Sequence, residues 1–145
     1  MDVLRRNTDY AIRAMLYLSD CYGKRPVSVK ELATERSFSY QLGCKLLQKL
    51  RKAGFVKSSM GPKGGYELSR DPAKITLYEI IDLFQQGIRL NKCLLGGDGC
   101  EFQSGCQVSL KLVSLQRYID GYLGGITLDE LLSNQQASKE KQKTG

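Results

Sequence analysis

The sequence predicts a mainly α protein: a winged helix-turn-helix of three helices and a β-hairpin wing, followed by a long dimerisation helix. Three patterns predict this fold. A short capped helical segment precedes a longer basic one, a glycine-rich turn separates two strand-like segments, and a narrow apolar seam recurs at helical spacing in the C-terminal half. The 145 residues, 41% of them apolar, suffice for one compact core.

The first predicted helix covers residues 8–22, where apolar residues recur on one face at helical spacing. We expect Asn7 or Thr8 to cap its start, because short polar side chains can accept the free backbone N–H groups there. Gly23 and the turn that follows it should end the helix.

A helix-turn-helix is predicted from residue 28 onwards. Ser28-Val29-Lys30-Glu31 matches a capping box, in which the serine accepts a backbone N–H while the glutamate reaches back to the cap. A helix of about two turns follows, and Ser37-Phe38-Ser39 breaks it. The next helix carries leucines on one side and ends before Gly54. A short helix, a tight turn and a longer basic helix are typical of DNA-binding proteins.

A β-hairpin is predicted directly after that helix. Residues 55–59 and 66–69 mix apolar and polar side chains, and Gly61-Pro62-Lys63-Gly64-Gly65 joins them. A hairpin in this place makes a wing. It could serve only to close the core, but Lys63 on a glycine- and proline-rich tip favours a phosphate or minor-groove contact.

Three further helices are predicted in the C-terminal half. Thr76-Leu77-Tyr78-Glu79 is a second capping box, and Gly87 should end the helix that it opens. A long helix from Gln107 to Gly124 and Gly125 carries a seam that suits a partner helix, although ordinary core packing would give a similar pattern. A third capping box at Thr127 opens a short last helix. The predicted dimerisation residues are Val108, Leu112, Leu115, Ile119 and Tyr122.

Positive charge is concentrated in the N-terminal half. Residues 1–75 contain 15 Lys or Arg and 7 Asp or Glu, a net charge of +8, whereas residues 76–145 contain 7 and 8, a net charge of −1. Between Glu35 and Glu67 there are seven basic residues and no acidic one. Such a half favours a polyanion such as a double-stranded DNA operator, although a solvated basic surface would have the same charge.

Several classes of protein lack support in the sequence. No apolar run approaches the roughly 20 residues of a membrane helix, and the N-terminus has no signal pattern, so we expect a cytoplasmic protein that contacts no membrane. No enzyme is expected, because the chain has no histidine, no nucleotide-binding glycine motif and no evident carboxylate pair.

Three of the five cysteines, Cys93, Cys100 and Cys106, lie within fourteen residues that also contain four glycines. Thiolates bind iron strongly, and glycines let backbone N–H groups approach a cluster's sulfurs. The spacing is too long for structural zinc knuckles and differs from ferredoxin runs. The segment is a candidate site for an iron–sulfur cluster, with free or oxidisable thiols as the alternative. Cys21 and Cys44 are not expected to be ligands.

In this order, the winged helix, the cysteine segment and the long helix resemble the Rrf2 family of bacterial winged-helix regulators, in particular its iron–sulfur type, the IscR-like and NsrR-like members. The resemblance covers about residues 5–134. The residues that carry it are Thr8-Asp9-Tyr10-Ala11, Leu50-Arg51-Lys52-Ala53-Gly54, Gly61-Pro62-Lys63-Gly64-Gly65-Tyr66 and Ile126-Thr127-Leu128. It implies a homodimeric repressor or activator whose cysteines hold a 2Fe–2S or 4Fe–4S cluster that senses iron, redox state or nitric oxide.

The sequence departs from the family pattern in three places. The gap between Cys93 and Cys100 is one residue longer than expected, and the wing residue before Gly61, usually arginine, is Met60. IscR-like members also have a ligand histidine after the third cysteine, and this chain has no histidine. NsrR-like members use an aspartate in the first helix instead, so the resemblance implies Asp9 of the other subunit as fourth ligand. Another cysteine, a small molecule or solvent is the alternative, and an acidic residue there also complements the helix dipole.

The leading hypothesis is therefore a dimeric, sequence-specific DNA-binding transcriptional regulator whose DNA affinity is controlled by the cluster. The alternative is a metal-free regulator of the same fold that senses by cysteine oxidation or a partner protein. A small iron–sulfur electron-transfer protein is a remote alternative, because it leaves the basic half unexplained. Ser39, Tyr40, Gln41, Cys44 and Lys45 are expected to reach base edges, and Lys49, Arg51, Lys52, Lys57 and Lys63 to hold the DNA backbone.

These expectations divide the chain into three parts. Residues 1–75 form the winged-helix DNA-binding region, residues 76–134 the cluster-binding loop and dimerisation helices, and residues 135–145 a disordered polar tail. A dimer implies a roughly palindromic operator, with half-sites about one helical turn apart or a multiple of it.

Overall fold

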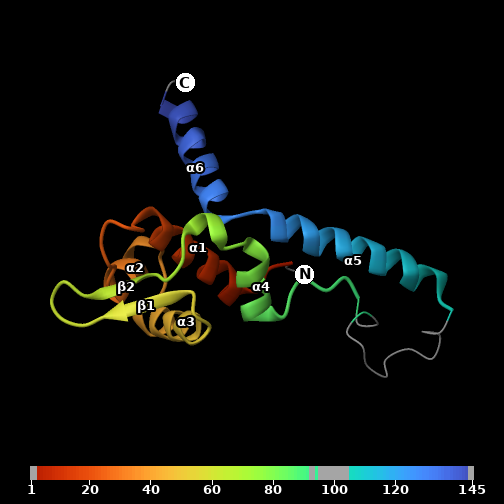
Figure 1. Cartoon of the computed structure of the whole chain (residues 1–145), viewed down its shortest axis with the longest axis horizontal. Coiled ribbons are helices and arrows are strands. Elements are labelled where there is room, and N and C mark those ends of the chain that lie inside the picture. The colour runs from red at the N-terminus through yellow and green to blue at the C-terminus, as the bar shows by residue number, and fades with distance from the viewer. Residues whose placement is uncertain (1–2, 92–93, 95–104, 144–145) are drawn as a thin grey trace.

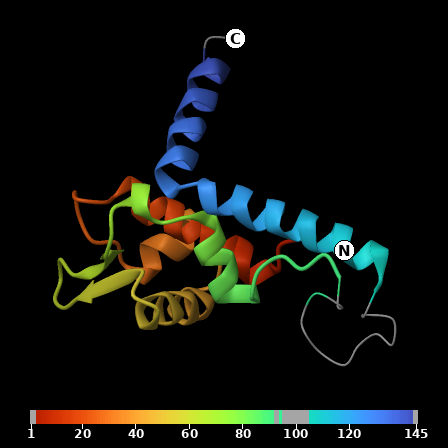
Figure 2. The same ribbon diagram turned by 45° about the vertical axis from the view of Figure 1, so that its right-hand side comes forward.

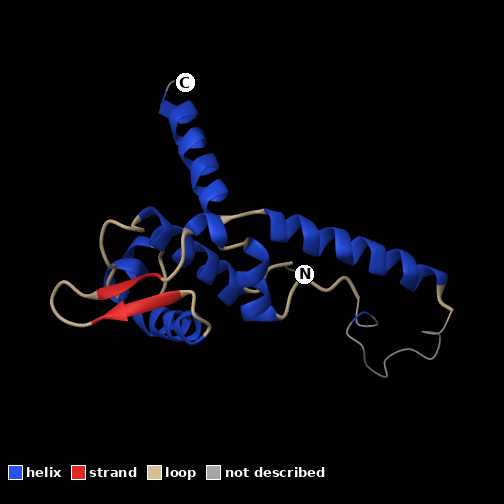
Figure 3. Cartoon of the chain, viewed as in Figure 1, coloured by secondary structure: helices blue, strands red, loops and turns tan. Residues whose placement is uncertain are grey.

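The computed structural model describes residues 3–91, 94 and 105–143. This part of the chain is mainly helical and contains one antiparallel pair of strands (Figures 1 and 3). The elements in chain order are α1 (Arg6–Asp20), α2 (Val29–Glu35), α3 (Tyr40–Lys52), β1 (Val56–Ser59), β2 (Gly65–Leu68), the 3-10 helix η1 (Pro72–Lys74), α4 (Leu77–Gln85), α5 (Gln107–Gly125) and α6 (Leu128–Lys143). The predicted fold class is confirmed.

One apolar core joins the winged helix to the start of α6. Helix α1 packs against α4 and α6, α2 packs against α3, and the strands pack against α1 and α3. The largest fully buried side chains are Met15, Leu18, Leu32, Leu47, Leu50, Leu68, Ile75, Ile80, Ile81 and Leu128. Because burying one such side chain contributes about 1.5–3 kcal/mol, the shared core holds α3 and the wing in one body.

Helix α1 starts earlier than predicted. It already includes Asn7 and Thr8, and its N-cap, Arg5, makes no side-chain cap hydrogen bond. The side chain of Gln85 on α4 takes over this role: its Oε1 accepts from the Arg5 backbone N–H at 2.9 Å, and its Nε2 donates to the Val3 carbonyl at 3.0 Å. The prediction that Asn7 or Thr8 caps the helix was wrong. The backbone N–H at the start of the helix is hydrogen-bonded by a side chain from α4 and not by a local cap.

The cap of α2 forms only half of the predicted capping box. The Ser28 hydroxyl accepts from the Glu31 backbone N–H at 3.1 Å. The Glu31 carboxylate pairs instead with Arg25 at 2.6 Å and accepts from the Tyr17 hydroxyl at 2.7 Å. The hydrogen bonds from Arg25 and Tyr17 hold the pKa of Glu31 below its usual value. A guanidinium is a stronger partner for a carboxylate than the cap's own N–H.

Gly43 allows α2 and α3 to approach closely. It is buried, and a Cβ atom there would lie 3.0 Å from Val29 Cγ1 and 3.1 Å from Phe38 Cε2. A larger residue would push these two side chains aside. The angle of α3 to the rest of the domain therefore depends on a glycine that sequence reasoning did not single out.

The wing is the predicted hairpin, with Val56 opposite Leu68 and Ser59 opposite Gly65. Its second strand is also tied to the loop before α2, because Val27 and Tyr66 exchange two backbone hydrogen bonds of 2.8 Å. This bridge attaches the hairpin to the helix-turn-helix at Tyr66.

Helix α4 begins with the complete capping box predicted at Thr76. The Thr76 hydroxyl accepts from the Glu79 N–H, and the Glu79 carboxylate accepts from the Thr76 N–H at 2.9 Å. The helix ends as predicted, since Gln86 and Gly87 both have left-handed backbone conformations, with φ of 61° and 83°.

Helices α5 and α6 project from the winged helix in different directions (Figures 1 and 2). Helix α6 is longer than predicted: residues 135–143 continue it, where a disordered tail was expected. The hydroxyls of Ser133 and Ser138 donate to carbonyls four residues earlier, and the segment is rich in good helix formers. Among the described residues, no helix combines the length and hydropathy that crossing a bilayer requires.

Candidate functional site

The outer face of α3 carries the residues predicted to reach base edges. Ser39 caps the helix, its hydroxyl accepting from the Leu42 N–H at 3.2 Å. Tyr40, Gln41 and Lys45 are exposed, Tyr40 to 56%. A helix that begins with exposed polar side chains is suited to a major groove, where donors and acceptors distinguish the base pairs.

Tyr40 and Cys44 interact one helical turn apart. A hydrogen bond with the Cys44 thiol is the main reason why the pKa of Tyr40 is raised above its usual value. The tyrosine is therefore neutral at physiological pH and keeps a hydroxyl that can donate or accept. Cys44 is half-buried and lies one turn after Tyr40 on the same face of α3.

Basic side chains border this face. Lys49, Arg51 and Lys52 are exposed in the last turn of α3, where positive charge also complements the helix dipole. Lys57 on β1 pairs across the hairpin with Glu67 at 3.3 Å, so part of its charge is balanced within the wing. Lys63 is exposed in the turn of the wing.

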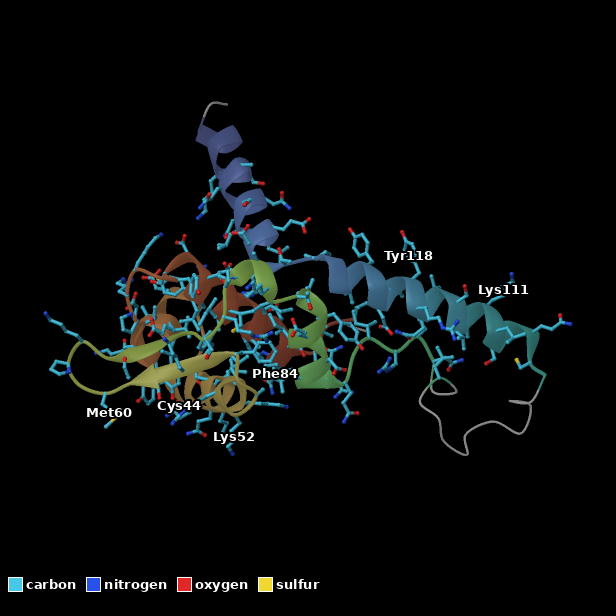
Figure 4. All side chains as sticks on the ribbon, in the orientation of Figure 1. Cys44, Lys52, Met60, Phe84, Lys111 and Tyr118 are labelled. Atoms are coloured by element: carbon cyan, nitrogen blue, oxygen red, sulfur yellow. The ribbon has the colours of Figure 1, made fainter. Side chains whose placement is uncertain are left out.

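Helix α3 and the wing meet along one edge of the molecule. Figure 4 shows Cys44, Lys52 and Met60 along this edge, and Lys111 and Tyr118 away from it on α5. We call this edge, formed by the outer face of α3 and the wing, the basic edge. All ten side chains predicted to contact DNA lie on these two elements or at the N-cap of α3.

Among the described residues, little covers the apolar seam of α5. Of the 19 residues of α5, all of them described, only Gln116 is buried. Val108, Leu115 and Tyr122 of the predicted seam are exposed to 65%, 47% and 64%. The remaining predicted seam residues, Leu112 and Ile119, are half-buried, and Tyr118 adds a stacked ring beside Tyr122.

The cysteine segment is described only at its end. Cys93 and Cys100 lie outside the described residues. Cys106 is the N-cap of α5, half-buried, and its side chain makes no cap hydrogen bond. The thiol is therefore not engaged in holding the helix, and a helix N-terminus is a favourable place for the negative charge of a ligand thiolate.

Asp9, the suggested fourth ligand, lies in the first turn of α1 and pairs with Arg13 at 2.8 Å. Both side chains are well exposed, 41% for Asp9 and 53% for Arg13, so the ion pair leaves the carboxylate accessible. The first turn of α5, which Cys106 caps, lies well away from α1 in both views (Figures 1 and 2). Within the described residues no three metal-ligating side chains gather.

A glutamine holds the segment that leads to the cysteines. The Gln116 Nε2 donates to the Ile88 carbonyl at 2.6 Å, and its Oε1 accepts from the Leu90 N–H at 3.1 Å. Arg89 and Asp120 form an ion pair of 3.7 Å beside it. The sequence does not predict this contact, because a hydrogen bond between residues 28 apart has no local signal.

The comparisons with known proteins agree with this arrangement. The sequence matches the model of the Rrf2 family, described as an iron-dependent transcriptional regulator, over residues 4–134. A protein of Xenorhabdus nematophila, named HTH-type transcriptional regulator IscR, is 32% identical over 127 residues, which are 88% of this chain and 77% of that protein.

Two solved structures are also similar. The structure of CymR (YrzC), described as the global cysteine regulator of B. subtilis, has a TM-score of 0.78 and 27% identity, and the match covers 92% of this chain and 98% of that one. The structure of T. potens IscR has a TM-score of 0.72 and 29% identity, with 90% and 86% covered. All of these relatives are named as regulators, and none is named as an enzyme.

Proposed function

Since the chain belongs to the Rrf2 family of transcriptional regulators, we propose that it is a homodimeric, sequence-specific DNA-binding regulator whose DNA affinity is controlled by an iron–sulfur cluster. Like its relatives, it is a regulator and not an enzyme. The observation that carries DNA binding is the basic edge, where the exposed, capped α3 lies beside the wing. Residues 36–66 contain seven basic side chains and no acidic one, and the acidic side chain of the wing, Glu67, pairs with Lys57.

In the proposed complex, α3 lies in the major groove. Tyr40, Gln41 and Lys45 face base edges, and the other base-contacting positions are Ser39 and Cys44. Lys49, Arg51, Lys52, Lys57 and Lys63 contact phosphates, which position the protein without reading sequence. We therefore assign DNA binding to residues 1–75.

The exposed apolar face of α5 supports the homodimer. Three seam side chains, Val108, Leu115 and Tyr122, are about half or more exposed to solvent, and apolar surface of this extent is normally covered. A second α5 packed on the seam would cover it and would place two copies of α3 for a palindromic operator. We assign the dimer contact to Val108, Leu112, Leu115, Ile119 and Tyr122.

Cys93, Cys100 and Cys106 would hold the cluster, with the partner's Asp9 as fourth ligand. Cys106 fits this role because its thiol is half-buried yet not used by the helix that it caps. Asp9 fits because its carboxylate is well exposed and pairs with the exposed guanidinium of Arg13. When bound, the cluster would supply an iron centre that responds to iron supply, oxidants or nitric oxide.

A metal-free regulator that senses through its thiols is the second candidate. It is favoured by the similarity to a protein described as a global cysteine regulator and by the lack of a histidine ligand. The remote third candidate, an electron-transfer protein, would leave the basic edge without a role.

Spectra and DNA binding of anaerobically purified protein test the proposal. We expect visible absorption and a Mössbauer signal of an iron–sulfur cluster, and binding to selected duplex DNA that changes when the cluster is removed. Cys100→Ser should abolish the cluster, whereas Cys21→Ser, at a cysteine outside the segment, should keep it. Colourless protein with thiol-dependent DNA binding would favour the second candidate, and a cluster without specific DNA binding the third.

A further inference from the structure

Met60 follows strand β1 directly and is 99% exposed, although it is large and apolar. A single exposed apolar side chain is ordinary on a protein surface. Exposure alone therefore does not indicate a function for Met60, and its location must be considered. Here the side chain stands at the wing, in the part of the molecule that also carries the exposed basic residues.

A hydrogen-bonded turn that requires glycine follows Met60. The Gly64 N–H donates to the Gly61 carbonyl at 3.0 Å, and Gly61 has a φ of 98°, a conformation that favours glycine. A Cβ atom at Gly64 would overlap the backbone carbonyl of Ser59. Met60 therefore lies where β1 ends and the turn of the wing begins.

Met60 shares an edge with the recognition residues. Figure 4 places it along the same edge as Cys44 and Lys52 of α3. Lys57 and Lys63 are the charged residues nearest to it in the sequence, and no acidic residue occurs between residues 36 and 66. If α3 lies in a major groove, a hairpin beside it faces the adjacent minor groove.

We propose that Met60 is an apolar minor-groove contact that wedges its thioether side chain between two base pairs beside each half-site. This inference rests on the proposed DNA binding. Methionine is unbranched and polarisable and adapts to irregular gaps, and apolar wedges of this kind unstack base pairs and bend the duplex. Met60 would therefore select pyrimidine–purine steps, which unstack easily, rather than a hydrogen-bonding pattern.

The proposal has a signature that distinguishes Met60 from its charged neighbours. Met60 carries no charge and releases no counterions, so Met60→Ala should weaken DNA binding without changing its salt dependence. Lys63→Ala should instead reduce the slope of log K against log salt by about 1. Met60→Leu, which keeps an apolar side chain of similar volume, should restore most of the affinity.

The experiment uses the full chain and duplexes that the wild type selects from a random-sequence library. The base steps opposite the wing, located by footprinting, are changed in turn to TA, CA and AA, and 2-aminopurine is placed at each. We expect Met60→Ala to bind duplexes with TA or CA about tenfold more weakly than the wild type, and duplexes with AA almost as tightly as the wild type. The fluorescence of 2-aminopurine should increase only when the wild type or Met60→Leu binds.

The outcomes separate this inference from the function on which it rests. If the wild type binds no duplex, both fail. If it binds a duplex with steep salt dependence, while Met60→Ala binds equally well and the fluorescence stays constant, only the wedge fails. A Met60→Ala variant with a reduced salt slope would also overturn the wedge, because its effect would be electrostatic.

Discussion

The ammonium group of Lys49, in the last turn of α3, lies 5.0 Å from the centre of the Phe84 ring on α4. Helix α4 continues into the segment 88–90 that Gln116 holds on α5, and its Gln85 binds the chain before α1. A set of contacts therefore runs from residues 88–90, which precede the cysteine segment, through α4 to α3. The Lys49–Phe84 contact joins α4 to α3.

We expect the Lys49–Phe84 contact to contribute about 0.5–1 kcal/mol, the usual range for an exposed cation–π pair. A double-mutant cycle with Lys49→Met and Phe84→Leu, followed by urea unfolding, should give this coupling energy. Both substitutions keep apolar bulk and remove only the cation or the ring. Lys52→Met on the same helix is the control, and its effect on the free energy of unfolding should be additive with that of Phe84→Leu. If the effects of Lys49→Met and Phe84→Leu are also additive, the two side chains do not interact.

Operator binding should weaken steeply with salt. With about six phosphate contacts, the slope of log K against log salt should be near −5. Lys52→Ala should weaken binding to all sequences alike and lower the slope by about 1, whereas Gln41→Ala should relax base preference at one position. Lys111, exposed on α5 away from the basic edge, provides the control, because Lys111→Ala should change neither quantity. A flat salt dependence would exclude the basic edge as the DNA surface.

The α5 seam should be buried between two chains. Leu115→Asp would place a carboxylate in the apolar contact and should give monomers that bind DNA poorly. Leu110→Asp is the matched control: Leu110 is on the same helix and 71% exposed, but five residues before Leu115 and on another face. Sedimentation velocity at micromolar concentration distinguishes the states. A monomeric wild type, or equal effects of the two substitutions, would refute the assignment.

Features that depend on neighbours within four residues could be predicted from the sequence. The capping box at Thr76 and the boundaries of α5 agree with expectation, because each depends on residues that are close together in the sequence. The wing followed in the same way from the glycines between two short strands.

Features that depend on distant residues could not be predicted. The start of α1 depends on Gln85, which is 80 residues away from Arg5. The Glu31 carboxylate pairs with Arg25 and not with the backbone N–H of Ser28, as a capping box requires. Of the candidate site, the exposed face of α3 followed from helical spacing. A contact between Asp9 and the cysteines of another chain depends on a second copy, and no pattern in one sequence fixes its geometry.

Acid should selectively weaken the start of α4. Burial opposes ionisation of Glu79, but the hydrogen bonds from Thr76 and Arg70 outweigh it and keep the pKa of this carboxyl below its usual 4.5. Because its pKa is lower in the folded than in the unfolded state, the ionised Glu79 stabilises the folded protein at pH values above about 4.5. This stabilisation is lost as the pH falls through the pKa of the folded state.

Glu79→Gln tests this prediction, because glutamine can still accept from the Thr76 N–H while carrying no charge. At pH 7 the variant should be less stable by about 1 kcal/mol, and the difference should shrink as the pH falls below 4.5. Urea unfolding across this pH range measures it. Asp82→Asn, at an exposed acid on the same helix, is the control, and a constant difference between Glu79→Gln and wild type would contradict the prediction.

Asp9 provides the sharpest test of the proposed fourth ligand. Its ion pair with Arg13 joins two exposed side chains one turn apart, and such pairs contribute only about 0.3–0.5 kcal/mol. Asp9→Asn and Arg13→Gln both break this pair, but only Asp9→Asn removes the carboxylate. If Asp9 is a ligand, Asp9→Asn and Asp9→Ala should alter the cluster's absorption and its rate of reaction with nitric oxide or oxygen, while Arg13→Gln should match wild type. Cys93→Ala should lose the cluster altogether. If both Asp9 variants keep wild-type spectra and rates, Asp9 serves only the first turn of α1, and the fourth position belongs to another cysteine, a small molecule or solvent.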